Sequence, residues 1–239
     1  VHFHGADDAT TIYQRAGWLL TYGSTSSTTI GGGLIGVRLH HIYPQSGCGA
    51  VNVIRGFRKV ITDILCVNVG RLLKIGNVSY VYGAGDVFVE RIRGYCANVA
   101  EPFIETIEGS GLFITNSHVY TTCDYPRDAW TLHSAKTGRY FLGHSTGNWD
   151  TINIEGCTTN RFDVAMNVNA ASGKTIGNIH ASGFLDYNKT SCVSLVSGGG
   201  TITDCWFQKL YGVSTDGNCF NIDGTAGPVI NIYMTNVLS

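Results

Sequence analysis

The chain of 239 residues has few charged side chains and little proline. Charged residues make up 14% of it, proline occurs 4 times, and 16 basic residues nearly balance 17 acidic ones. We therefore expect no nucleic-acid partner, because phosphate contacts need a surplus of Lys and Arg. No apolar run reaches the roughly 18–20 residues of a membrane-spanning helix, so no membrane insertion is expected either.

The N-terminus lacks the pattern of a signal peptide. The chain begins at Val1, and no basic segment followed by an apolar stretch and a cleavage site is present. We interpret the chain as a piece of a longer protein.

The eight cysteines form no CxxC pair and no Cys/His cluster with zinc spacing, so we predict neither a metal site nor another cofactor. Several of them stand where an apolar core residue would. This favours free, buried thiols and folding in a reducing compartment over a framework of four disulfides.

What the sequence does contain is glycine, 31 residues in all, among many β-branched side chains, a composition typical of short strands and tight turns.

The segments "VITDILC" (60–66) and "TITDCWF" (201–207) share an I-T-D core and prompt a search for a repeat. Similar short segments recur along the chain at 87–94, 112–119, 151–156, 175–181 and 229–234. With the residue after the Asn/Asp position as register, the successive intervals are 28, 25, 37, 25, 26 and 27.

The columns of this repeat alternate between apolar and polar residues. The register position and the position two residues later are mostly apolar or small, which is the period of a strand with one buried face. The position before register holds mainly Asx residues, which we interpret as one ladder at a turn. It reads Asp63, Arg91, Asn116, Asn153, Asn178, Asp204 and Asn231.

A period near 26 residues with several short strands per repeat predicts an all-β fold, namely a right-handed parallel β-helix. We expect one domain over 1–239, a single-stranded solenoid of about nine coils. Leucine-rich repeats have a similar length, but their Leu spacing is absent here. Each coil would bury its apolar face by stacking on its neighbours.

This pattern, with the opening "VHFHGADDATTIYQ" (1–14), resembles the right-handed β-helices of the pectate-lyase superfamily, and bacteriophage tailspike and tail-fibre proteins in particular. The resemblance covers most of the chain at the level of fold and includes no catalytic signature. It implies a homotrimer in a phage tail, folded in the host cytoplasm and contacting bacterial surface polysaccharide. A secreted polysaccharide lyase is the other member of the superfamily considered, although the clustered Asp residues of a calcium site are not found.

Chemistry on a β-helix is expected on its outer face, because the interior is packed. Coils stack about 4.8 Å apart, so outward residues in one column form a row. The predicted row consists of Arg93, His118, Glu155, His180, Trp206 and Tyr233. The aromatic residues offer apolar faces to sugar rings, and Arg93 supplies a donor. Glu155, placed between two histidines, is the candidate general acid or base.

The longest interval contains an expected insertion at about 123–149, rich in aromatic and charged residues. Trp130, Tyr140 and Trp149 are predicted to form a binding wall beside the row, or to pack on a neighbouring subunit. Glycosidases need two carboxyl groups, and the candidate partners of Glu155 are Asp124 or Asp128 in the insertion, Asp150, or a carboxylate of another subunit. In a lyase, Glu155 or His180 with Arg93 would serve instead. The main hypothesis is therefore a tailspike β-helix that binds, and in one version cleaves, polysaccharide. The alternatives are a non-enzymatic trimeric shaft and a secreted lyase.

Overall fold

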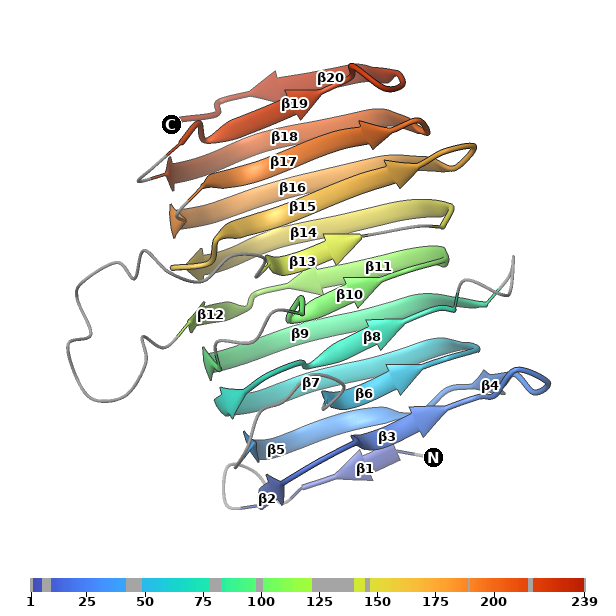
Figure 1. The fold of residues 1–239 in the computed structure, drawn as a ribbon. Coiled ribbons are helices and arrows are strands. Elements are labelled where there is room, and N and C mark those ends of the chain that lie inside the picture. Colours follow the sequence, from blue (N-terminus) through green and yellow to red (C-terminus); the bar gives the residue numbers. More distant parts are fainter. Residues whose placement is uncertain are drawn as a thin grey trace.

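The computed structural model describes residues 2–5, 10–41, 49–77, 83–97, 101–121, 140–144, 147–188, 190–214 and 217–238. In these residues the chain is a parallel β-helix of about seven turns without a helix, which confirms the predicted fold class. Figure 1 shows the coil rising from the N-terminus to the C-terminus, with strands of the nearer and farther sheets running in opposite directions. The expected nine turns are too many. One reason is that a single coil, from Asn116 to Gly156, takes 40 residues, whereas the preceding coil takes 25.

The described strands form two sheets in which every neighbouring pair of strands is parallel. The first sheet has 12 strands: β1 (His2–His4), β2 (Thr11–Gln14), β4 (Thr29–Ile30), β5 (Gly33–His41), β7 (Gly56–Val69), β9 (Ala84–Cys96), β11 (Gly109–Thr115), β12 (His118–Thr121), β14 (Trp149–Asn160), β16 (Thr175–Asn188), β18 (Thr201–Ser214) and β20 (Val229–Thr235). The second has eight: β3 (Trp18–Tyr22), β6 (Gly49–Val53), β8 (Leu73–Ile75), β10 (Ile104–Thr106), β13 (Tyr140–His144), β15 (Val164–Ala171), β17 (Ser191–Gly198) and β19 (Phe220–Asp223).

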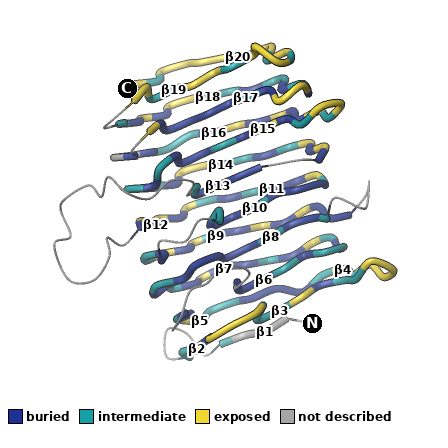
Figure 2. Tube along the Cα trace, viewed as in Figure 1, coloured by how far each residue is buried: buried dark blue, intermediate teal, exposed yellow. Residues whose placement is uncertain are grey.

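The core is the continuous interior between the two sheets. Alternate residues of each strand point into it, so that Ile61, Val89 and Ile114, which stack on consecutive coils, are essentially inaccessible. In Figure 2 the middle coils are largely dark, whereas β20 is mostly exposed. The predicted register residues, such as Ile64 and Ile179, do face inward. Two residues later the prediction fails in two copies, because Gly156 and Met234 are exposed.

Two sharp corners bend the long strands of the first sheet, each at a residue with positive φ. The first corner consists of Gly31, Arg58, Asp86, Gly111, Thr151, Asn178, Asp204 and Asn231. The second corner consists of Gly36, Asp63, Arg91, Asn116, Gly156, Lys209 and Asn236. In all coils but one the two corners are five residues apart; in β16 the segment between them is one residue shorter. Gly and Asx dominate both sets because they tolerate the left-handed region best.

The single Asx ladder predicted from the sequence is wrong, because it joins residues of both corners. Asp63, Arg91 and Asn116 belong to the second corner, whereas Asn178, Asp204 and Asn231 belong to the first. Asn153 belongs to neither, since it pairs with Phe113 and His180 within the strands. Both corners have the same backbone conformation and the same residue preference. A search for repeated residues can therefore align the first corner of one coil with the second corner of another.

The coil that holds the expected insertion contains regular structure at its end. Tyr140–His144 forms β13, which pairs with β10 and β15, and Trp149 begins β14. The predicted boundary at 149 is therefore too late, and residues 122–139 lie outside the described part of the chain.

The six described cysteines carry thiols rather than disulfides, as expected: Cys66, Cys96, Cys157, Cys192 and Cys205 are buried and Cys219 is half-buried. Burial raises the pKa of Cys157 to about 11 and that of Cys205 to about 12. Such thiols pack as small apolar groups and have little thiolate at neutral pH.

Thr151 is the one β-branched residue at a described corner, with φ of 66°. A left-handed conformation costs an L-residue about 1–2 kcal/mol, and Asn bears it better than Thr. We predict that Thr151→Asn raises the free energy of unfolding by about 1 kcal/mol in urea titrations. The control is Thr115→Asn, in a strand with ordinary backbone angles, which should be neutral or slightly destabilising. Equal effects of the two substitutions would show that the corner is not strained.

His144 is fully enclosed on β13. Its Nε2–H donates to the carbonyl of Gly147 at 3.1 Å, and its Nδ1 accepts from the Thr106 hydroxyl at 2.8 Å, an arrangement that suits the neutral ring. Burial lowers the pKa of His144 to about 4. The unfolded chain takes up a proton near pH 6.5 and the folded one does not, so stability is complete above pH 6.5 and falls as the pH drops toward 4.

We predict that His144 contributes roughly 3 kcal/mol to this loss of stability. His144→Gln should be less stable than the parent at pH 8 but lose less stability between pH 6.5 and 4, as measured by urea unfolding at each pH. Burial also lowers the pKa of His41 to about 4, so part of the slope should remain. Parallel curves for parent and variant would contradict this role of His144.

Candidate functional site

The predicted functional row is divided between two columns of the first sheet. His118 pairs with Arg93 on one side and with Thr158 on the other. His180 lies in a different column, between Asn153 and Trp206, and Trp206 pairs with Tyr233. The first column follows the second corner and the other precedes it. The row as predicted is therefore wrong: Arg93 and His118 are neighbours, as are His180, Trp206 and Tyr233, but the two groups lie in different columns.

Glu155 belongs to neither column. It pairs with Thr115, directly before the second corner, and its side chain is exposed. The expected arrangement of Glu155 between His118 and His180 on adjacent rungs does not exist. The cause is again the confusion of the two corners. The repeat alignment placed Glu155 after the second corner, whereas it lies directly before it.

Three aromatic rings of the predicted row form a stack along the outer face. The rings of His180 and Trp206 are 4.5 Å apart at an angle of 15°, and those of Trp206 and Tyr233 are 5.5 Å apart at 10°. Trp206 therefore has a ring on each face, whereas Tyr233 stacks through one face and is 50% exposed. The assignment of Trp206 and Tyr233 to a polysaccharide-binding surface stays a prediction.

The predicted binding wall is not assembled as expected. Trp149 is 2% exposed and lies in the core, where its indole donates to the carbonyl of Thr151 at 3.2 Å. Its assignment to a binding surface is therefore a mistake, caused by placing the start of β14 in the insertion. Tyr140 begins β13 on the second sheet, and burial raises the pKa of its phenol. Asp128 and Trp130 lie outside the described residues.

A polar groove of about 380 Å³ lies at the second corner around β12. It is lined by Arg93, Gly94, Asn116, Ser117, His118, Tyr120, Gly156 and Thr158. Arg93 and His118, taken from the predicted row, provide exposed donors at adjacent rungs. Tyr120 is 39% exposed, and its ring meets His118 edge-on at 6.3 Å. The groove thus combines directional polar groups with apolar ring surface.

Two glycines in this lining have no side chain to fill the groove. Gly156 occupies the corner position where the three preceding coils carry Asp63, Arg91 and Asn116. Gly94 has φ of 106°, and a Cβ there would lie 2.2 Å from the carbonyl oxygen of Cys66. The sequence analysis missed Tyr120, Thr158 and Gly156 as groove residues. The signal that could have found Gly156 is the loss of a side chain at this corner after three successive coils that carry one.

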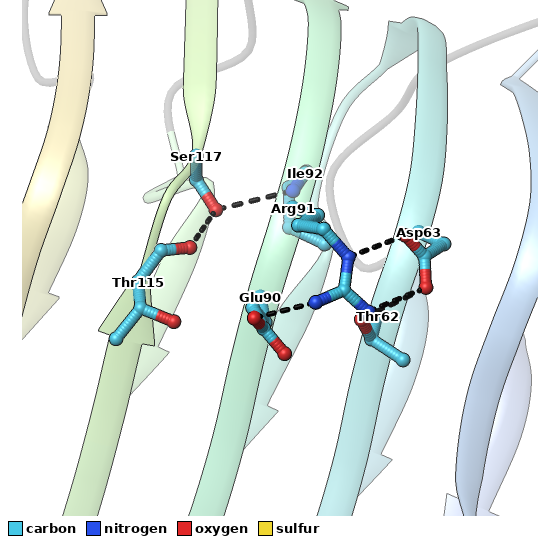
Figure 3. A network of polar contacts seen from close by, with 7 residues as sticks. All are labelled: Thr62, Asp63, Glu90, Arg91, Ile92, Thr115 and Ser117. Atoms are coloured by element: carbon cyan, nitrogen blue, oxygen red, sulfur yellow. Dashed lines mark hydrogen bonds and ion pairs between the residues drawn. The ribbon is translucent and has the colours of Figure 1, made fainter.

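Polar side chains connect neighbouring coils at the second corner beside the groove (Figure 3). The guanidinium of Arg91 donates to both carboxylate oxygens of Asp63, at 2.6 and 2.8 Å, and keeps the pKa of Asp63 below its usual value. This pair is largely exposed and contributes little stability. Ser117 lies between β11 and β12 and bonds to the neighbouring strand β9 through its side chain. Its hydroxyl accepts from the Ile92 amide at 3.1 Å and donates to the Thr115 carbonyl at 2.9 Å.

The described lining of the groove has no carboxylate. In the described part of the chain no three His, Cys, Asp or Glu side chains gather in a way that could hold a metal ion. No helix in that part is long and apolar enough to span a bilayer. The arrangement can donate and accept hydrogen bonds and present an aromatic ring, which is chemistry suited to binding.

Comparison with known proteins adds no family: no family model, curated protein or solved structure matches the chain.

Proposed function

We propose that the chain is a carbohydrate-binding β-helix of the phage tailspike or tail-fibre kind, and that the groove around β12 contacts bacterial surface polysaccharide. The observation that carries the proposal is the convergence of Arg93, Asn116, His118, Tyr120 and Thr158 on one open groove. A hydroxyl-rich chain needs donors and acceptors at several points and an apolar surface for its ring carbons, and the groove offers both.

Binding without cleavage is the version that the geometry favours. Hydrolysis of a glycosidic bond uses two carboxyl groups about 5–9.5 Å apart, and the described lining of the groove contains none. Glu155 lies in another column, beside Thr115. An enzymatic version would require a carboxylate from residues 122–139, which follow β12 directly in sequence, or from another subunit.

A trimeric shaft is the second candidate, and one apolar pair favours it. Phe88 and Phe113 stack at 5.1 Å on the outer face, and Phe88 is 43% exposed. Exposed rings on the flat side of a β-helix would be covered if three copies packed side by side. Light scattering of the purified chain distinguishes a trimer from a monomer.

The groove predicts which substitutions weaken binding on a microarray of bacterial surface polysaccharides. Arg93→Ala and His118→Ala should each raise the Kd for a bound polysaccharide by roughly tenfold, as expected for the loss of one or two hydrogen bonds. The matched control is Arg38→Ala. Arg38 stands in the same column as Arg93 and is exposed, but it lies two coils away from the groove.

Unchanged binding in the Arg93 and His118 variants, or an equal loss in the Arg38 variant, would contradict a site at this groove. Shortening of the polysaccharide by the parent chain, followed by size-exclusion chromatography, would show cleavage and overturn the version without catalysis.

A further inference from the structure

Two cysteine side chains meet on consecutive coils near the C-terminal end. Cys192 lies in β17 and Cys219 directly precedes β19, and their sulfur atoms are 2.8 Å apart. The backbone holds them in this position, because the amides of Cys192 and Val193 both donate to the carbonyl of Cys219, at 2.8 and 3.0 Å. A disulfide bond is about 2.05 Å long, so the sulfurs need only a small movement to bond.

The neighbouring strand makes room for this pair of sulfur atoms. Gly212 of β18 is buried against them, and a Cβ there would lie 2.4 Å from the sulfur of Cys219 and 2.7 Å from that of Cys192. Any other residue at 212 would displace the pair. The space is therefore shaped for two sulfur atoms in contact, which is an observation independent of their distance.

The two thiols differ in access. Cys192 is fully buried, whereas Cys219 is half-buried against the core. The hydrogen bond with Cys192 lowers the pKa of Cys219, whereas burial raises the pKa of Cys66, Cys157 and Cys205. Cys219 is thus the thiol that a soluble reagent can reach.

We propose that Cys192 and Cys219 form an intramolecular disulfide when the folded chain meets a small-molecule disulfide such as oxidised glutathione. The thiolate of Cys219 attacks one glutathione sulfur, forms a mixed disulfide and releases the first glutathione thiolate. The thiolate of Cys192 then attacks the sulfur of Cys219 and releases the second. The two protons of the protein thiols pass to the two glutathione thiolates. Both cysteines are oxidised, and one glutathione disulfide is reduced to two thiols.

The bond would join Cys219, directly before β19, to β17 in the preceding coil. Beyond this bond β20 is mostly exposed, with Ile230 and Met234 more than two-fifths exposed. A crosslink between residues 192 and 219 shortens the chain that can unravel from this end, and so it restricts the open state. The chain would fold with reduced thiols, and upon oxidation β18, which lies between the two cysteines, would be held in place.

The test is incubation of the folded chain with excess oxidised glutathione, followed by alkylation and peptide mass mapping. We expect the peptides containing Cys192 and Cys219 to be linked, with the loss of two hydrogen atoms, while Cys66 and Cys96 remain alkylated. Amide hydrogen exchange of β18, which lies between the two cysteines, should slow by about tenfold or more in the oxidised protein. Cys192→Ala and Cys219→Ser should remove both effects, and Cys205→Ser, which changes a buried cysteine elsewhere, should keep them.

Two results would overturn the proposal. One is that Cys192 and Cys219 remain alkylated in the folded parent chain under these conditions. The other is that Cys219 stops at a stable mixed disulfide with glutathione. If either cysteine variant fails to fold, the peptide map and the exchange rates of the parent chain, before and after oxidation, decide the question on their own.

Discussion

The structure depends on a backbone constraint: two left-handed residues, five positions apart, in nearly every coil of the first sheet. Each such residue bends the strand sharply while the flanking residues continue to pair with the coils above and below. The conformation is costly for most side chains, so Gly, Asn and Asp gather at both corners. The same spacing determines which outward residues precede a corner and which follow it, and so decides which side chains can lie on adjacent rungs.

This constraint explains how much of the fold could be predicted from the sequence. Apolar alternation and the repeat length identify a parallel β-helix, and the inward positions follow from them. The assignment of a segment to one corner or the other could not be predicted, because both corners use the same residue types. "VITDILC" and "TITDCWF" illustrate the difficulty: Asp63 stands at the second corner and Asp204 at the first. Their shared letters reflect a shared backbone conformation at different places in the coil.

The candidate site was partly predictable for the same reason. Arg93 and His118 come from coils in which the repeat alignment followed the second corner, and they are true neighbours. His180, Trp206 and Tyr233 come from coils in which it followed the first corner, and they are also true neighbours. Glu155 lies in the coil where the alignment changes from the second corner to the first, so its predicted contacts do not exist. The groove depends on what a corner lacks, namely a side chain at Gly156, and a missing side chain leaves no motif to recognise. The position of Trp149 inside the core could be known only once β13 and β14 were seen to be regular strands.

The measurement that tests this arrangement most directly is crosslinking across the second corner. Paired residues on neighbouring parallel strands lie about 4.8 Å apart, within the Cα separation that a disulfide accepts. The double variant His118→Cys with Thr158→Cys should form an internal disulfide under mild oxidation, identified by peptide mass mapping, because these two residues are paired. The double variant His118→Cys with Glu155→Cys should not. A crosslink between 118 and 155 in place of one between 118 and 158 would contradict the account of the corners, the groove and the divided row.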